Sequence, residues 1–210
     1  MGGLFITIEG GEGAGKSTQI PLIKDFLASL GRQVITLREP GNTPIAEEIR
    51  QILKTPREDE ILYPETELLL MYAARSQLVR KVIRPALEAG IDVLCDRHDL
   101  SSLAYQGGGH GLPAEAIETC RTLALADLRP DLTLLLDVDP IVGMRRASRR
   151  GTLDRFEQLG NPFMERVRKA YLDYARSHPE LVKVIDATPG PDVIFAEIKG
   201  YLKEILAHVV

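Results

Sequence analysis

A glycine-rich segment near the N-terminus constrains this chain more than any other feature. Residues 10–17 read GGEGAGKS and fit the pattern GxxxxGK[ST]. An apolar run at residues 4–9 precedes the segment, and a pattern with helical spacing follows it. Glycines let the backbone approach an anion closely, and the N–H groups of such a turn bind phosphate together with the next helix N-terminus. The setting therefore predicts a strand, a phosphate-binding loop and a helix, in that order.

The residues of this loop have separate expected roles. Lys16 should reach the β- and γ-phosphates of a nucleoside triphosphate, and the Ser17 hydroxyl should coordinate Mg²⁺. The residues expected around the triphosphate are Gly10, Gly11, Glu12, Gly13, Ala14, Gly15, Lys16, Ser17 and Thr18. A glycine-rich turn without a ligand is the alternative, and the strand and helix patterns on either side argue against it.

Short apolar runs alternate with longer helical patterns along the chain. Strands are predicted at residues 4–9, 33–38, 92–96, 132–138 and 182–186, and helices at 16–30, 45–53, 65–89, 113–125, 140–148, 162–176 and 192–208. This alternation is typical of a parallel sheet buried on both faces. Pro21 and Pro85 are expected to perturb their helices. We expect a three-layer α/β fold, with a five-stranded parallel sheet flanked by helices, as one domain over residues 1–210.

Composition limits the partners of the chain. Its 210 residues carry a formal net charge of −4, and residues 145–150 form its only basic cluster, so we expect no nucleic-acid partner. The N-terminus does not resemble a signal peptide, and no run of about 18 apolar residues occurs, so we expect no membrane span. Cys95 and Cys120 have no metal-ligand spacing and are expected to be buried and reduced, which favours a cytoplasmic protein.

Two predicted strands end in aspartate, at Asp96 and Asp137. Ligands of open α/β folds bind outside the carboxyl ends of the strands, where a carboxylate can hold Mg²⁺ or its waters. Asp96 is the better candidate because Arg97 follows it. Asp137 is better explained as a cap for the helix predicted from residue 140.

Arginines near strand ends indicate a second anionic ligand. Arg38 ends the second predicted strand, Arg97 follows Asp96, and Arg75 lies in the long helix. Guanidinium groups match phosphate geometry and can offset the repulsion between two phosphate-bearing substrates. The sequence has no guanine-reading NKxD motif. The pattern favours a small-molecule kinase over a nucleotide switch, an assembly ATPase or a nucleotide-binding protein without catalysis.

At these residues the chain resembles the bacterial thymidylate kinases, which are P-loop nucleoside monophosphate kinases. The shared segments are EGGEGAGKST at 9–18, REPG at 38–41, YAAR at 72–75, DRH at 96–98, AYQGGG at 104–109, RPDLT at 129–133 and LDRFE at 153–157. The resemblance implies ATP and dTMP as substrates, Mg²⁺ as cofactor, a role in dTTP synthesis and a homodimer packed through long helices. A kinase for another nucleoside monophosphate, or for a nucleoside, is the alternative.

The resemblance also assigns an acceptor-binding region at about residues 38–75. Arg38 and Arg97 would hold the dTMP phosphate, and Glu39 and Pro40 would arrange the acceptor site. Arg75 would face thymine O4.

Further acceptor contacts follow from the same resemblance. Gln106 would hydrogen-bond the base near N3, although a loop residue in a glycine-rich turn is the alternative. Tyr105 would pack near the sugar, and Ser101 or Ser102 would touch the acceptor. Many relatives carry an aromatic residue four positions before the base-reading arginine, where this chain has Met71. Either Met71 or Tyr72 covers the thymine, and both interpretations stay open.

The charged stretch RRASRRGTLDRFE at 145–157 resembles a mobile lid, expected as an insert at about 145–161. In the bacterial subtype the phosphate loop lacks an arginine and the lid supplies the cation. Arg149, Arg150 or Arg155 is therefore expected to act on the transferring phosphoryl group, beside Lys16 and Arg97. No general base is required, and His98 is expected to be structural. The loop at residues 186–188 is expected near adenine.

Overall fold

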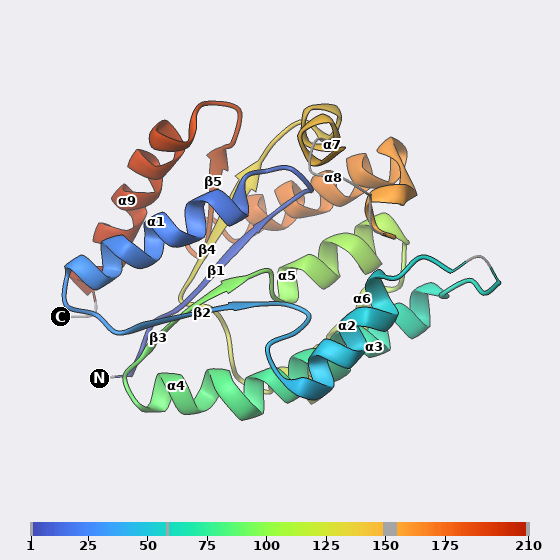
Figure 1. Ribbon diagram of the computed structural model, residues 1–210, viewed down its shortest axis with the longest axis horizontal. Coiled ribbons are helices and arrows are strands. Elements are labelled where there is room, and N and C mark those ends of the chain that lie inside the picture. Colours follow the sequence, from blue (N-terminus) through green and yellow to red (C-terminus); the bar gives the residue numbers. More distant parts are fainter. Residues whose placement is uncertain (1, 58, 149–154, 209–210) are drawn as a thin grey trace.

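Five parallel strands form one sheet in the computed structural model, which describes residues 2–57, 59–148 and 155–208 (Figure 1). The strands are β1 (Phe5–Gly10), β2 (Val34–Arg38), β3 (Asp92–Asp96), β4 (Leu132–Asp137) and β5 (Val182–Asp186). Their order across the sheet is β2-β3-β1-β4-β5, and every pairing is parallel. The predicted parallel sheet is confirmed, with each strand end within one residue of its expected position.

Helices cover both faces of the sheet, so the three-layer prediction is also confirmed (Figure 1). On one face lie α1 (Lys16–Ser29) and α9 (Pro191–His208). On the other lie α3 (Pro64–Leu78), α4 (Arg84–Glu88), α6 (Ala114–Leu125) and α8 (Asn161–Ser177). Shorter helices follow strands or connect these layers: α2 (Pro44–Lys54), α5 (Asp99–Ser102) and α7 (Pro140–Ser148).

Strand alternation explains why both faces of the sheet are apolar. Ile6 and Ile8 of β1 pack into the cluster beneath α1 and α9. Phe5, on the opposite side of the same strand, packs with Val93 and Cys95 beneath α3 and α6. Successive strand residues face opposite sides, and here both sides are covered, so apolar residues predominate on both faces of the strands, with a few buried polar residues such as Thr7 and Glu9.

The two perturbing prolines behave differently. Helix α1 continues through Pro21 from Lys16 to Ser29. The long helix predicted at residues 65–89 is instead divided into α3, a π-helical turn at Val79–Ile83 and α4. Pro85 occupies the start of α4, so the irregularity falls in the turn directly before this proline.

The glycine-rich segment after β3 is helical, and its interpretation as a turn is wrong. Leu103–Gly109 forms a π-helical segment that continues α5 and packs on α8. A Cβ atom on Gly108 would lie 2.4 Å from the Ala170 side chain, and one on Gly109 would lie 2.5 Å from the Phe163 ring. These glycines therefore permit close contact with α8.

Other sequence predictions can be compared with the fold. Both cysteines are free; Cys95 is buried as expected, whereas Cys120 is half-buried. Asp137 does not cap α7, because both its oxygens accept hydrogen bonds from Arg168, at 2.7 and 2.8 Å. Asp139 accepts from the Ile141 N–H instead, at 2.9 Å. Across the described residues, none of the helices has the length and apolar character that crossing a bilayer demands.

Two helical glycines provide a matched stability test. A Cβ atom on Gly143 in α7 would lie 2.3 Å from the Glu12 carbonyl, so Gly143→Ala should displace the phosphate loop and lower the free energy of unfolding by about 1–3 kcal/mol. Gly200 in α9 is exposed with open space around it, so Gly200→Ala should raise this energy by about 0.5–1 kcal/mol. Urea unfolding measures both; equal stability of the two variants would contradict the packing described.

Candidate active site

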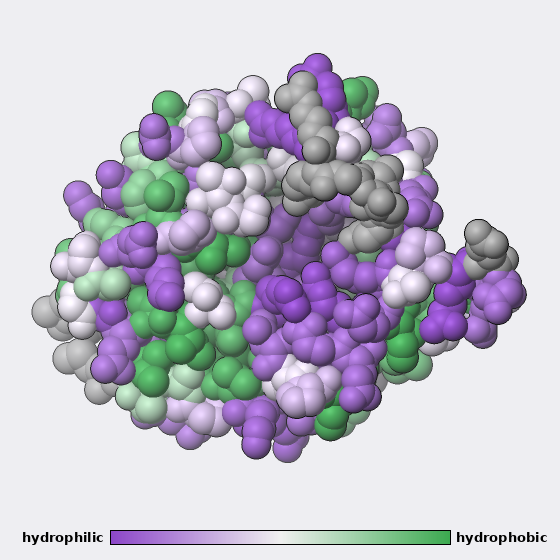
Figure 2. All heavy atoms as spheres, in the orientation of Figure 1, coloured by the Kyte–Doolittle hydropathy of each residue, from purple (hydrophilic) through white to green (hydrophobic). Residues whose placement is uncertain are grey.

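The carboxyl ends of the strands open into a cleft of about 720 Å³. Hydrophilic side chains gather in this hollow near the middle of the face shown in Figure 2. The predicted site residues that line it are Glu12, Gly13, Ala14, Gly15, Lys16, Ser17, Thr18, Arg38, Glu39, Pro40, Met71, Arg75, Asp96, Arg97, Ser101, Ser102, Tyr105, Gln106 and, from the loop expected near adenine, Thr188. Gly10, Gly11, Tyr72 and Arg155 are outside its lining, and Arg149 and Arg150 lie outside the described residues.

Strand register brings these segments together. Arg38 at the end of β2 pairs with Asp96 at the end of β3, and Ile8 of β1 also pairs with Asp96. The phosphate loop, the Arg38 segment and the Arg97 segment therefore begin at the same edge of the sheet. This arrangement follows from parallel pairing, in which all carboxyl ends share one edge.

The phosphate loop places its lysine side chain inside its own turn. Gly13 and Gly15 have φ values of 68° and 91°, which favour glycine, and Gly15 precedes the first turn of α1. Lys16 Nζ donates hydrogen bonds to the carbonyl oxygens of Gly10 (3.0 Å) and Gly11 (2.9 Å). Burial, with the charge of Arg97 adding to it, lowers the pKa of Lys16 to about 8. A phosphate group beside Nζ would supply the missing negative charge.

Arg97 links the phosphate loop to the acceptor side of the cleft. Its guanidinium donates to the Gly10 carbonyl oxygen (2.9 Å) and to Glu12 Oε1 (2.6 Å), and it lies 5.1 Å from the centre of the Tyr105 ring. Burial alone would raise the pKa of Glu12, but the charges of Arg97, Lys16 and Lys54 outweigh it and lower this pKa to about 2. Glu12 is therefore ionised and holds Arg97 by a charged hydrogen bond.

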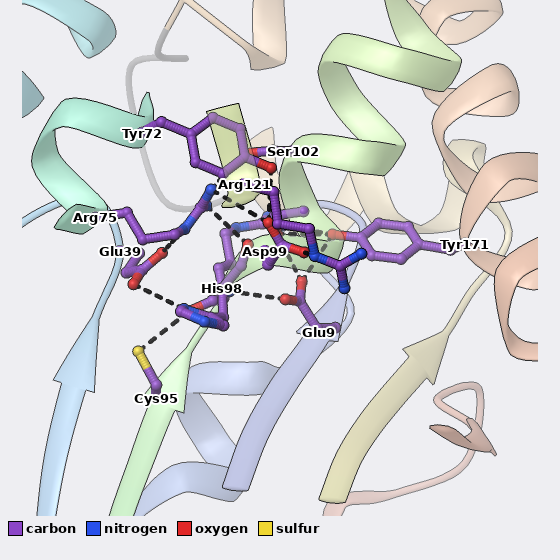
Figure 3. A network of polar contacts seen from close by, with 12 residues as sticks. Glu9, Glu39, Tyr72, Arg75, Cys95, His98, Asp99, Ser102, Arg121 and Tyr171 are labelled. Carbon is purple, nitrogen blue, oxygen red and sulfur yellow. Dashed lines mark hydrogen bonds and ion pairs between the residues drawn. The ribbon is translucent and has the colours of Figure 1, made fainter. Parts of the chain in front are cut away.

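A buried ion pair fixes Arg75 on the other wall (Figure 3). Arg75 is only 2% exposed, and its nitrogens donate to Glu39 Oε2 (2.6 Å), Ser102 Oγ (2.9 Å) and the His98 carbonyl (2.9 Å). His98 Nδ1 lies 2.9 Å from the other Glu39 oxygen, in keeping with a structural role.

Met71 and Tyr72 point in different directions. Met71 lines the cleft. The Tyr72 hydroxyl instead donates to Asp99 Oδ1 at 2.6 Å, and the Arg75 guanidinium lies 4.6 Å from the centre of its ring (Figure 3). Tyr72 therefore packs against Arg75 and does not line the cleft.

Gln106 occupies the cleft wall with one end of its amide paired. Its Nε2 donates to Glu67 Oε1 at 2.5 Å. Its Oε1 is buried and has no hydrogen-bond partner within the described part of the chain. Buried polar atoms are normally paired, so this oxygen is a candidate contact for a ligand.

The oxygen ligands that Asp96 and Ser17 offer to the cleft suit Mg²⁺. Asp96 lines the cleft with a buried Oδ1 that has no partner among the residues described, and the exposed Ser17 lines the same cleft. No group of three or more acidic, histidine or cysteine residues suited to a metal occurs in those residues. Magnesium commonly takes one or two protein ligands and fills its remaining positions with water and substrate phosphates, so this sparse set suits it.

Three cations of the cleft wall were missed by the sequence analysis: Arg50, Lys54 and Arg146. Arg50 donates to the Pro40 carbonyl (2.7 Å), while Arg146 donates to the carbonyls of Ala187 (2.8 Å) and Thr188 (3.1 Å). Arg50 and Arg146 therefore each hold a loop that also lines the cleft. Spacing within the basic stretch 145–150 could have suggested Arg146, but its partners lie more than 40 positions away.

The lowered pKa of Lys16 gives a test of the phosphate loop. Below pH 8 the amine of the free protein is charged; above pH 8 it is largely neutral, and binding of a triphosphate should restore its proton. We expect net proton uptake on ATP binding at pH 8, measured by titration calorimetry in buffers of different ionisation enthalpy. Lys16→Met should abolish this uptake and weaken binding by more than about tenfold. Equal uptake in the variant would contradict the assignment.

Comparison with known proteins identifies the family. A family model described as thymidylate kinase matches residues 8–198. The chain is 49% identical over 204 residues to a thymidylate kinase of Pseudoalteromonas translucida, covering 97% of each chain, and 52% identical over 187 residues to one of Pseudomonas fluorescens, covering 89% of each. The crystal structure of thymidylate kinase from Ehrlichia chaffeensis superposes with a TM-score of 0.77 at 31% identity, over 96% of this chain and 99% of that one. With this agreement in sequence and fold, the chain belongs to the thymidylate kinase family.

Proposed function

We propose that this member of the family transfers the γ-phosphoryl group of ATP to dTMP, giving dTDP and ADP for dTTP synthesis. One observation carries the proposal. Lys16 Nζ and an Arg97 nitrogen donate to the same oxygen, the Gly10 carbonyl, at 3.0 and 2.9 Å. The cation expected at the donor phosphates and the cation expected at the acceptor phosphate both line the cleft and are held by the same backbone oxygen beside it.

This convergence suits phosphoryl transfer. The reaction needs two anionic groups in line and neutralisation of the charge that develops between them. Lys16 would face the β- and γ-phosphates, while Arg97, oriented by Glu12, would face the dTMP phosphate with Arg38. Asp96 and Ser17 would hold Mg²⁺, which supplies further positive charge at the donor phosphates. A phosphate dianion is already a nucleophile, so no protein base is needed.

The wall of the cleft that carries Arg75 and Gln106 would bind the base. Arg75 would face O4 of thymine, and Gln106 Oε1 would accept a hydrogen bond from N3–H. Met71 is the better candidate to cover the ring, because it lines the cleft whereas Tyr72 donates to Asp99. Tyr105 would pack near the sugar, because its ring faces Arg97 and its hydroxyl donates to Glu12 at 3.1 Å.

The catalytic lid arginine belongs to the proposal as well. Arg155 donates to the Leu53 carbonyl at 2.7 Å, pairs with Glu67 and does not line the cleft. It would have to leave both partners to reach a phosphate, which favours Arg149 or Arg150 as the cation. A mobile lid at 145–161 within a single domain remains our proposal, as does a cytoplasmic location.

A homodimer is proposed from an exposed apolar face. Leu69 of α3 is 61% exposed and Leu123 of α6 is 82% exposed, and these helices pack against each other. Large apolar side chains on adjacent helices mark candidate interfaces. Light scattering should show twice the monomer mass, and replacing both leucines with Lys should give monomers.

The proposed reaction is tested with ATP, Mg²⁺ and a panel of acceptors. A coupled assay for ADP should show the highest kcat/KM with dTMP among dTMP, dUMP, CMP and AMP. Comparable turnover with CMP or AMP, or ADP release without any acceptor, would overturn the proposal.

The lid arginines form a second test. Among Arg149→Ala, Arg150→Ala and Arg155→Ala, at least one should lower kcat by about 10³-fold, the scale of an arginine that stabilises the transferring phosphoryl group. Single-turnover rates measure the step directly. Unchanged rates in all three variants would refute a lid-supplied cation.

Variants of Met71 and Tyr72 test which of these two side chains covers the thymine ring. Met71→Ala should raise the KM for dTMP by about tenfold, equivalent to about 1.4 kcal/mol of lost contact. Tyr72→Phe removes a buried donor to Asp99 and should lower the free energy of unfolding by about 1 kcal/mol, while the dTMP KM stays within about twofold. Tyr72→Phe keeps the aromatic ring, so Tyr72→Ala tests the alternative: a rise of about tenfold in the dTMP KM in Tyr72→Ala, with none in Met71→Ala, would assign the cover to Tyr72.

A further inference from the structure

Glu67 is a buried carboxylate to which the proposed reaction gives no role. It lies on α3 with 0% exposure. Its Oε1 accepts from Gln106 Nε2 at 2.5 Å and lies 3.3 Å from His110 Nε2. Its Oε2 accepts from the Arg155 guanidinium. A carboxylate held at both oxygens cannot rotate, so its acceptor positions are fixed in space.

The charge state of Glu67 decides what it can do to its neighbours. Burial alone would raise its pKa, but the contact with His110, the charge of Arg155 and the hydrogen bond from Gln106 outweigh burial and keep it below its ordinary value. Glu67 is therefore ionised at neutral pH. An ionised carboxylate only accepts hydrogen bonds.

This acceptor-only character sets the orientation of the Gln106 amide. An amide has one donor end and one acceptor end. Because the donor end faces Glu67, the acceptor end is left without a partner from the described residues, on a side chain that lines the cleft. Turning the amide over would place two oxygens against each other in a buried site, at a cost of several kcal/mol.

We infer that Glu67 contributes to base specificity by holding Gln106 so that its amide presents an acceptor to the base. The inference rests on the proposed function, in which Gln106 reads the edge of the base at N3. Thymine and uracil carry N3–H, a donor that satisfies this oxygen. Cytosine carries an unprotonated N3, which would leave two acceptors facing each other. Glu67 does not touch the base and acts as a positioning residue.

The substitution Glu67→Gln tests this orientation with little change of shape. The new amide can donate to Gln106 Oε1, which lets the Gln106 amide turn and present its NH₂ group to the cleft. The ratio of kcat/KM for dTMP to that for dCMP should then fall by at least about tenfold, with a loss for dTMP and a gain for dCMP. The KM for ATP should stay within about twofold, because neither Glu67 nor its partner Arg155 lines the cleft.

Two comparisons separate this role from general destabilisation. Glu65→Gln removes an exposed carboxylate from the first turn of the same helix and should leave the dTMP to dCMP ratio unchanged. Glu67→Asp keeps the acceptor-only charge and should retain more of the ratio than Glu67→Gln does. A purely structural role would lower activity with both acceptors alike and leave their ratio unchanged, which would overturn the inference.

Gln106→Met distinguishes failure of the inference from failure of the proposed base site. If Gln106→Met loses the dTMP preference while Glu67→Gln keeps it, Gln106 reads the base without Glu67 and the inference is wrong. If Gln106→Met keeps the preference, the base-reading role of Gln106 falls, and the inference falls with it.

A measurement on the unaltered protein covers the case in which Glu67→Gln does not fold. In protein with nitrogen-15-labelled glutamine, the Gln106 side-chain NH₂ should be protected from exchange both alone and with dTMP, because Glu67 holds it in both states. Loss of this protection when dTMP binds would show that Gln106 leaves Glu67, and would overturn the inference.

Discussion

The site depends on buried or half-buried arginines that are each held by a carboxylate of the protein. Arg97 is paired with Glu12, Arg75 with Glu39 and Arg155 with Glu67. Removing such charges from water costs several kcal/mol per ion, so these pairs contribute little net stability. Their contribution is position: each guanidinium is fixed before a ligand arrives, and little conformational entropy remains to be lost on binding.

Glu9, which lies in β1 directly before the phosphate loop, is another buried carboxyl group that organises the site. It is fully buried and accepts hydrogen bonds from the His98 N–H (2.7 Å), Ser101 Oγ (2.6 Å) and the Tyr171 hydroxyl (2.9 Å), as Figure 3 shows in part. Burial raises the pKa of Glu9, although these bonds and the charge of Arg97 oppose the rise. The carboxyl thus joins the ends of β1 and β3 to α8. The segment that carries Arg97 is therefore fixed by the contact of His98 with Glu9 as well as by the contacts of Arg97 with Gly10 and Glu12.

Much of the fold could be predicted from the sequence because its signals are local. Each strand is a short, mainly apolar run without internal proline or glycine, and the phosphate loop is defined by backbone conformations that glycine favours, such as those of Gly13 and Gly15. The π-helical segment Leu103–Gly109 was missed because its glycines serve a distant surface, that of α8. Asp137 was misassigned for a similar reason: its partner, Arg168, lies 31 positions away and outcompetes a local cap.

The same contrast between local signals and partners distant in sequence applies to the residues of the cleft. Most expected site residues inside contiguous motifs line its wall. Arg50 and Arg146 on the wall, and Glu67 beside it, were missed because their partners are distant in sequence. One signal could have suggested Glu67. Positions 67, 71 and 75 are spaced by four and share a helix face, and Met71 and Arg75 were already expected in the site. An acidic residue on that face, with the apolar Leu68 beside it, needs a buried partner.

Because Glu67 contacts both Gln106 and Arg155, the base site and the lid segment are not independent. One of its oxygens holds the amide that we assign to the base, and the other holds Arg155 from the segment assigned to the lid. Removing the Arg155 charge would leave Glu67 buried with fewer compensating partners, and would thereby weaken its hold on Gln106. A loss of activity in an Arg155 variant therefore has two possible origins, one at the transferring phosphate and one at the base. They differ in signature, because a defect at the phosphate lowers turnover with every acceptor, whereas a defect passed through Glu67 changes the preference between acceptors.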